Sequence, residues 1–284
     1  MMWSNFETTV GGKWVLTGEH SVLRMAEAIA LPHPEVFLKL RFQPFLNSPP
    51  EGSAGDFSVE PLIAEPLILK MLTSIEGFKL PSGKLRIEST IPIGAGLGSS
   101  AALCVALTRW LTRPLQLPLS QVLGFATRLE HLFHGKSSGM DVAVVSVGAP
   151  IAFTSKEGPT PLPIKKLPRF TLHDTGLRCK TSLCIEKVDL FRTQFLEKGR
   201  QVDHEMKAAS ELAKTGLIHY HLENRKQGLS LLTKAMEKGR SCFYAWDLVP
   251  PEVQKLEDQL LNEGALAVKL TGAGAGGMVV ALWS

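Results

Sequence analysis

The stretch Ile91–Leu107, with the sequence IPIGAGLGSSAALCVAL, places three alternating glycines and two serines before an apolar run. The residues in front of it predict a strand that ends near Ile91, and those behind it predict a helix from Ser100 to Leu111. A glycine-rich loop in this position turns backbone N–H groups and a helix N-terminus toward one point, which attracts an anion. The loop therefore predicts either an anion-binding site or a plain glycine turn with a serine cap.

Two familiar phosphate-binding motifs do not fit this loop. A Walker A loop has a lysine directly before its Ser or Thr, whereas Gly98 occupies that place. A dinucleotide fingerprint is G-x-G-x-x-G, whereas the loop has G-x-G-x-G. The segment Gly272–Gly277 does match the fingerprint, but only seven residues follow it, too few for a βαβ unit. Neither a P-loop NTPase nor a Rossmann fold is expected.

A second stretch, Leu129–Asp141, contains two carboxylates that suit different tasks. A helix from Ser120 to Phe133 carries Glu130 and is expected to end at Gly135, after which a short loop delivers Asp141 into an apolar segment. One carboxylate could hold a metal ion while the other accepts a proton. The alternative is that the two are unrelated side chains on a helix end and a loop.

Zinc is the competing metal for this stretch, since Glu130, His131 and His134 are near neighbours. Neither H-E-x-x-H nor H-x-x-E-H is present, because position 127 is Thr127. The four cysteines are scattered without C-x-x-C spacing, which favours reduced thiols over a zinc site or a disulfide framework. A zinc site is therefore not expected.

The whole chain has 284 residues and a net charge of +4, with its basic residues dispersed among acidic ones. Nucleic-acid binding is therefore not expected. No segment reaches the roughly eighteen apolar residues of a membrane span, and the N-terminus lacks the pattern of a secretory signal. These features predict a cytoplasmic globular protein with no membrane association.

Short alternating segments predict strands, and longer periodic segments predict helices, mostly in the second half. The expected strands are Lys13–Leu16, Val36–Leu40, Lys84–Glu88, Ala265–Leu270 and Met278–Trp283. The expected C-terminal helices are Val188–Lys214, Gly216–Cys242 and Pro251–Asn262. The proline-rich segment 159–168 is typical of a connector, so we expect an α+β fold with two domains, residues 1–160 and 161–284.

A third stretch, Gly11–Leu23, has the sequence GGKWVLTGEHSVL, with a lysine near the start of a strand and a Gly-Glu-His turn. Taken singly, these residues are ordinary. In order along the chain, however, GGKWVLTGEHSVL, IPIGAGLGSSAAL and KLTGAGAGGMVVAL resemble the three signature motifs of the GHMP kinases, the second almost letter for letter. The resemblance covers roughly residues 8–24, 83–153 and 263–283.

This resemblance implies an ATP-dependent small-molecule kinase with an N-terminal mixed sheet with helices, a C-terminal helix-rich α/β sandwich, and the active site in the cleft between them. It implies that Asp141 is the base toward the substrate hydroxyl, that Lys13 lies beside it, and that Ser100 and Glu130 bind magnesium. It also implies a set of residues that bind ATP, namely Ser89, Gly94, Ala95, Gly96, Leu97, Gly98, Ser99 and Ser100. The substrate-binding residues that it implies are Glu19, His20, Thr181, Gly272 and Ala273.

Within the family, GEH followed by Ser-Val-Leu and the segment EHLFHGKSSGMD are more similar to the mevalonate kinases than to the galactokinases or homoserine kinases. The expected small-molecule partner is therefore mevalonate, and self-association as a homodimer stays open. The chain departs from the family pattern at four positions. Gly11 and Ser137 stand where Pro is common, and Arg178 stands one place before the family's arginine, which leaves Cys179 in that place.

Three alternatives to a mevalonate kinase remain at this point. A GHMP kinase could instead act on phosphomevalonate or a sugar, and the departures after residue 170 leave this open. A decarboxylase-like relative is disfavoured, because such relatives typically lack the Gly-Glu-His turn. A metabolite sensor without catalysis is disfavoured by the joint presence of Lys13, Glu130 and Asp141.

Overall fold

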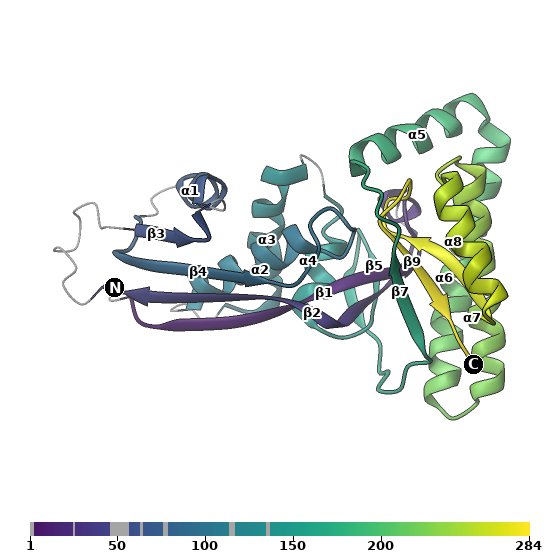
Figure 1. Ribbon diagram of the computed structural model, residues 1–284, viewed down its shortest axis with the longest axis horizontal. Helices are drawn as coiled ribbons and strands as arrows, with labels where there is room; N and C mark the ends of the chain where they lie inside the picture. The colour runs from purple at the N-terminus through teal and green to yellow at the C-terminus, as the bar shows by residue number, and fades with distance from the viewer. Residues whose placement is uncertain are drawn as a thin grey trace.

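The computed structural model describes residues 3–24, 26–45, 57–62, 65–75, 79–113, 117–134 and 137–284. Two β-sheets organise this part of the chain, one of six strands and one of three. In Figure 1 the six-stranded sheet runs along the long axis of the molecule, and the three-stranded sheet lies at its end beside a group of long helices. The N-terminus and the C-terminus lie toward opposite ends of the molecule.

The six-stranded sheet is built around one long strand, β2 (Ala28–Pro44). Strand β1 (Phe6–Thr17) pairs antiparallel with one edge of β2, while β4 (Gly83–Ser89) and β5 (Ile151–Thr154) pair antiparallel with opposite ends of its other edge. The sheet is completed by β3 (Phe57–Glu60), parallel to β4, and by β6 (Gly158–Pro161), antiparallel to β5. It is therefore a mixed sheet, as the resemblance implied.

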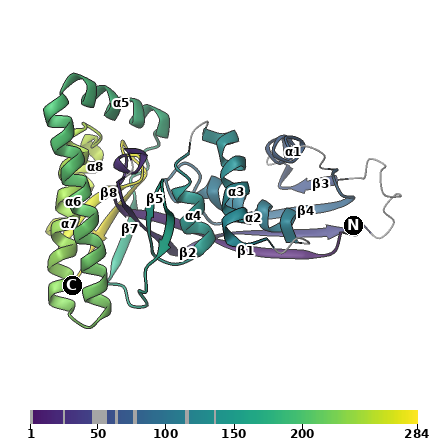
Figure 2. The same cartoon turned by 180° about the vertical axis from the view of Figure 1, so that it is seen from behind.

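Four helices cover one face of this sheet in both views (Figures 1 and 2). They are α1 (Glu65–Thr73), α2 (Ser99–Thr112), α3 (Leu119–His134) and α4 (Met140–Val147), and a short 3-10 helix, η1 (Ser21–Arg24), follows β1. Helix α2 is buried over residues 101–108, which agrees with a sequence that is apolar on every turn. It packs against β1, α3 and α4, so the glycine loop in front of it is held by the N-terminal core.

The three-stranded sheet is antiparallel, with β9 (Met278–Leu282) between β7 (Phe170–Asp174) and β8 (Ala267–Thr271). Residues 162–169 connect it to β6. Its helices are α5 (Thr181–Gln194), α6 (Leu196–His221), α7 (Arg225–Ala245) and α8 (Pro251–Asn262). A second apolar core forms where these helices meet the sheet, and it includes Phe243, Trp246, Val253 and Val279.

The α+β class is confirmed, but two predicted helices are wrong in their bounds. The helix expected from Val188 to Lys214 is interrupted at Phe195, between α5 and α6, and the helix expected from Gly216 spans the break between α6 and α7 at 222–224. Neither break contains the Pro or Gly that would indicate it in a sequence. Within the described residues, no helix has both the length and the apolar character needed to cross a bilayer.

Candidate active site

The glycine loop between β4 and α2 has a backbone that only glycine adopts readily. Gly94, Gly96 and Gly98 have φ angles of 74°, 79° and 79°. A Cβ atom at Gly98 would lie 2.8 Å from Cγ of Lys13, so this glycine also makes room for the lysine. Helix α2 begins at Ser99 without a side-chain cap at its N-terminus. The first turn of α2 thus offers main-chain donors to an anion, as the sequence predicts.

Lys13 and Asp141 meet beside this loop. Lys13 is buried on β1, and its backbone N–H donates to the carbonyl oxygen of Leu97 at 3.0 Å. Its Nζ lies 2.9 Å from Oδ2 of Asp141. The side chain of Lys13 is 3% exposed and that of Asp141 is 34% exposed, so the ion pair is closed at the lysine and open to solvent at the aspartate.

Glu130 is a buried carboxyl group close to this pair. Burial, and next the Asp141 carboxylate, raise the pKa of Glu130 to about 7, while Ser137 and Lys13 act in the opposite direction. The Ser137 hydroxyl donates to Oε2 of Glu130 at 2.5 Å and accepts from the N–H of Gly139 at 3.1 Å. Ser137, noticed in the sequence only as a departure, therefore fixes the orientation of a candidate metal ligand.

The connection from Glu130 to Asp141 ends in a helix. The short loop expected to deliver Asp141 into an apolar segment leads into α4, and Asp141 lies in the first turn of that helix, right after Gly139 with a φ of 79°. The predicted helix end at Gly135 lies outside the described residues. His131 is exposed while Glu130 is buried, so these two side chains point apart. The described part of the chain has no cluster of three or more His, Cys, Asp or Glu that could hold a metal ion.

The third glycine motif lies against the other two. A Cβ atom at Gly272 would lie 3.8 Å from Cα of Gly96, in the anion-binding loop. Thr271, directly before this motif, accepts from the N–H of Val15 at 2.9 Å and donates to the carbonyl oxygen of Val15 at 2.8 Å. Residues separated by more than 250 positions are thus joined at the end of β1.

Glu19 and His20 form a buried turn after β1. His20 has a φ of 57°, and its Nε2 donates to the carbonyl oxygen of Ala273 at 2.8 Å. Burial lowers the pKa of His20 to about 4, so its imidazole is neutral near pH 7. Oε1 of Glu19 lies 2.5 Å from Nζ of Lys269, and burial raises the pKa of the Glu19 carboxyl while Lys269 acts against that rise.

Ser89 and Thr181 lie farther out. Ser89 is exposed at the end of β4, where its Oγ accepts from the N–H of Ile91 at 3.2 Å. Thr181 is exposed as the first residue of α5. Arg178 comes closer, because a Cβ atom at Gly94 would lie 3.5 Å from its Cδ. The structure therefore brings the three motifs together and leaves Thr181 on the surface.

Two residues of this site were missed by the sequence analysis. Lys269 is fully buried against Glu19, and Thr271 anchors the end of β1. The available signal was Lys269 itself, the one charged residue in the strand AVKLT of β8. A charge in an otherwise buried strand is costly without a partner, which would have pointed to an ion pair.

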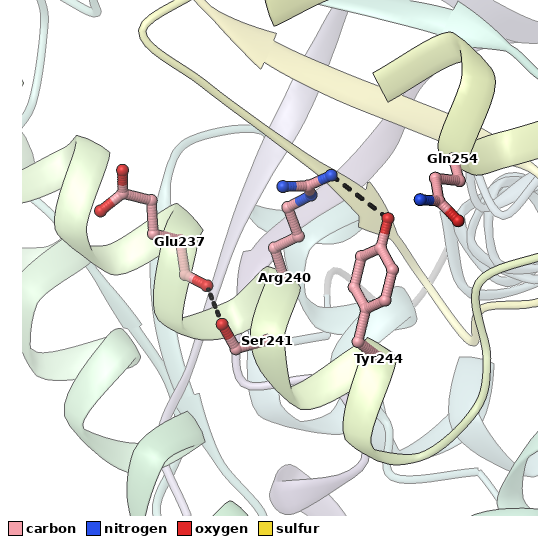
Figure 3. Close-up of a pocket in the computed structure, with 5 residues that line it drawn as sticks. All are labelled: Glu237, Arg240, Ser241, Tyr244 and Gln254. Atoms are coloured by element: carbon pink, nitrogen blue, oxygen red, sulfur yellow. Dashed lines mark hydrogen bonds between the residues drawn. The ribbon is translucent and has the colours of Figure 1, made fainter. Parts of the chain in front are cut away.

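A separate hollow lies on α7 and α8, and its wall contains none of the residues above (Figure 3). In it, Arg240 donates to the hydroxyl of Tyr244 at 3.2 Å, and both side chains also donate to the buried carboxylate of Glu257. These contacts join the two helices. The hollow is a feature of the helix packing and not of the candidate active site.

The two family models that match this chain are those for the GHMP kinases N terminal domain, over residues 66–149, and for the GHMP kinases C terminal, over residues 225–284. They cover the glycine loop, Glu130 and Asp141 in the first case and the third glycine motif in the second. The chain therefore belongs to the GHMP kinase family, and membership of a kinase family implies the use of ATP.

Among individual proteins, the chain is similar to mevalonate kinases. It is 28% identical to that of Aeropyrum pernix, over 96% of this chain and 86% of the relative. It is 32% identical to that of Pyrococcus horikoshii, over 69% of this chain but only 58% of the relative. The solved structure of L. major mevalonate kinase in complex with R-mevalonate has a TM-score of 0.79 at 22% identity, covering 100% of this chain and 89% of the other. At this identity, the similarity to the solved structure is a similarity of fold.

Proposed function

We propose that this protein transfers a phosphoryl group from ATP to the hydroxyl group of mevalonate and so produces 5-phosphomevalonate. The observation that carries the proposal is the Lys13–Asp141 pair, 2.9 Å apart beside the glycine loop. A proton acceptor next to a buried cation and a set of backbone donors is the equipment that phosphoryl transfer requires. The acceptor is taken from the relatives, which are named mevalonate kinases.

In this mechanism Asp141 accepts the proton of the acceptor hydroxyl while the hydroxyl oxygen forms a bond to the γ-phosphorus and ADP leaves. The ammonium of Lys13 lowers the pKa of that hydroxyl and stabilises the negative charge that develops on its oxygen. Main-chain N–H groups of residues 94–100 hold the triphosphate at the N-terminus of α2. Holding ATP and the acceptor hydroxyl in the reactive orientation then accounts for much of the rate, since the protein forms no covalent bond to either reactant in this mechanism.

Magnesium fits the residues of the site. Glu130 is buried close to a second carboxylate, an arrangement that a cation stabilises, and carboxylate and hydroxyl oxygens are the ligands that Mg²⁺ prefers. Glu130 and Ser100 would hold the ion, which would neutralise charge on the phosphate oxygens. Ser100→Ala should raise the magnesium concentration needed for half-maximal turnover, with Ser120→Ala on the exposed side of α3 as the control. An unchanged requirement would remove Ser100 from this role.

A substrate panel tests the acceptor. ADP release is measured with mevalonate, phosphomevalonate, galactose and homoserine at equal concentrations, and we expect the highest kcat/KM with mevalonate. Preference for phosphomevalonate or galactose would keep the kinase and replace the substrate. Measurable ATP binding without turnover of any acceptor would instead favour a metabolite sensor.

The division into residues 1–160 and 161–284 and a cytoplasmic location belong to the same proposal. The division is supported by the end of β6 at Pro161 and the start of β7 at Phe170, in different sheets. Limited proteolysis of the intact chain should cleave first within residues 162–169 if this segment is the connector. First cleavage inside either sheet would contradict the division.

A further inference from the structure

Lys269 occupies a fully buried position on β8. Its Nζ lies 2.5 Å from Oε1 of Glu19 and donates to the carbonyl oxygen of Leu270. The ring of Phe243 covers the ammonium at 5.2 Å. A Cβ atom at Gly239 would lie 3.1 Å from Cε of Lys269, so the absence of a side chain there leaves room for the lysine stem. The ammonium is thus confined on several sides and directed at one carboxylate.

Lys269 and Thr271 act on one segment of the chain. They are two residues apart on β8, so their side chains share a face of the sheet. Thr271 is bonded to both main-chain polar groups of Val15, and Lys269 is bonded to Glu19. The segment between these two attachments leads from the strand of Lys13 to the turn of Glu19 and His20. Strand β8 therefore fixes both ends of this segment.

Stability alone does not account for the Lys269–Glu19 pair. Removing two charges from water is expensive, and apolar side chains of similar volume are often as stabilising as a buried ion pair. Among the described residues, the second carboxylate oxygen of Glu19, Oε2, has no hydrogen-bond partner although it is buried, which adds to the cost. A costly pair at this place is better explained by the geometry that it imposes on its neighbours.

The turn that this ion pair holds is in contact with the third glycine motif. His20 follows Glu19 directly, and its left-handed backbone conformation aims Nε2 at the carbonyl oxygen of Ala273. Ala273 adjoins Gly272, which lies against Gly96 of the anion-binding loop. A shift of Glu19 would therefore move His20 and Ala273 together, on the side of the site where the family resemblance puts the acceptor.

We propose that Lys269 is a positioning residue of the acceptor site, which acts by holding Glu19 and through it the contact between His20 and Ala273. The identity of the acceptor, mevalonate, rests on the proposed function. The positioning role of Lys269 applies to any acceptor bound at this site. Lys269 is fully buried, so we expect its removal to act through Glu19 and to alter acceptor binding more than nucleotide binding.

Three variants test this role: Lys269→Met, Glu19→Leu and the double variant that carries both. Lys269→Met leaves a buried unpaired carboxylate, so its melting temperature should fall, whereas the double variant has an apolar pair and should recover most of that loss. Positioning predicts that the KM for mevalonate is raised at least about tenfold in Lys269→Met, which keeps Glu19, and stays raised in the double variant, with the KM for ATP within about twofold in both. About tenfold is the size expected for a lost charged hydrogen bond. Recovery of both the melting temperature and the KM for mevalonate would show a merely structural pair and overturn the proposal.

A readout independent of turnover separates this proposal from the proposed function. Hydrogen–deuterium exchange of the peptide that spans residues 15–24 should be faster in the double variant than in the unaltered chain, because this segment loses one of its two attachments to β8. Unchanged exchange there would overturn the positioning role. If the unaltered chain phosphorylates none of the four acceptors, the proposed function fails, and the exchange result still decides the role of Lys269.

Discussion

The ammonium of Lys13 lies 2.9 Å from the carboxylate of Asp141, and the exposed surface of the pair belongs almost entirely to the aspartate. A substrate hydroxyl can therefore approach Asp141 from solvent without displacing Lys13. The backbone N–H of Lys13 donates to the carbonyl oxygen of Leu97, so the strand that carries the cation is joined directly to the glycine loop. This relationship ties the proton acceptor to the place where an anion binds.

Asp141→Asn removes the proton acceptor and keeps the shape of the side chain. General-base catalysis contributes about 10² to 10⁴ in rate, so kcat should fall by that factor while ATP affinity stays within a few-fold. Steady-state kinetics and nucleotide titration measure the two quantities. Asp247→Asn is the matched control, because Asp247 is 87% exposed and its positive φ suits asparagine. Near-normal turnover in Asp141→Asn would remove Asp141 from its role as base.

Gly98→Ala should damage the site through Lys13. The new methyl group would meet Cγ of Lys13 at 2.8 Å, and the φ of 79° is itself unfavourable for alanine. A displacement of about 1 Å in a catalytic group costs on the order of 10²-fold in rate, so we expect a loss of kcat of that size. For Gly124→Ala on the exposed side of α3, the new Cβ would have no described atom within 4 Å beyond its chain neighbours and its own helix backbone, so this change should be neutral or stabilising. Equal activity of the two variants would contradict the close packing of Gly98 on Lys13.

The sequence was informative where local chemistry determines structure. Helix α8 has the predicted bounds Pro251–Asn262, because a proline at its first turn and a following glycine mark both ends. Helix α2 begins one residue before the predicted Ser100, directly after the glycine loop. The elements that carry the anion-binding loop were therefore predictable from residues close to it in sequence.

Elements that depend on distant partners were harder to predict. Strand β1 has 12 residues, whereas only Lys13–Leu16 was expected. The residues before Lys13 are in the strand because they pair with β2, and their own hydrophobic pattern does not predict it. In β2 the alternation is broken by Pro32 and Pro34, which hid a strand of 17 residues. The Lys269–Glu19 pair joins positions 250 apart, so the charge in β8 indicates an ion pair but no local signal identifies Glu19 as the partner.

Thr271→Val tests the attachment of β1 to β8. Valine has nearly the same shape as threonine but cannot replace the two hydrogen bonds to Val15, so buried main-chain groups lose their partner. The free energy of unfolding should fall by about 1–3 kcal/mol, measured by denaturant unfolding. Thr215→Val is the control, since Thr215 is exposed on α6 and its hydroxyl donates to the carbonyl oxygen of Glu211 in the same helix. Similar losses in both variants would show that the Thr271 bonds add nothing to the attachment.

His20 should make the stability of the chain depend on acid pH. Its pKa is about 4 in the folded state and about 6.5 when exposed, so the unfolded chain binds the proton first as pH falls. Between these two values the unfolded state holds more protons, and His20 therefore contributes a loss of stability on going from pH 6.5 to pH 4, of about 3 kcal/mol at most.

The variant His20→Asn isolates this contribution, because asparagine tolerates the left-handed backbone at position 20 and does not titrate. Glu130 has a raised pKa and acts in the opposite sense, but it is present in both proteins and cancels in the comparison. The melting temperature of the unaltered chain should exceed that of His20→Asn near pH 7, and the difference should shrink steadily toward pH 4. Parallel curves for the two proteins over this range would mean that His20 is protonated as easily in the folded chain as in water, and that its burial against Ala273 and Trp246 does not persist in solution.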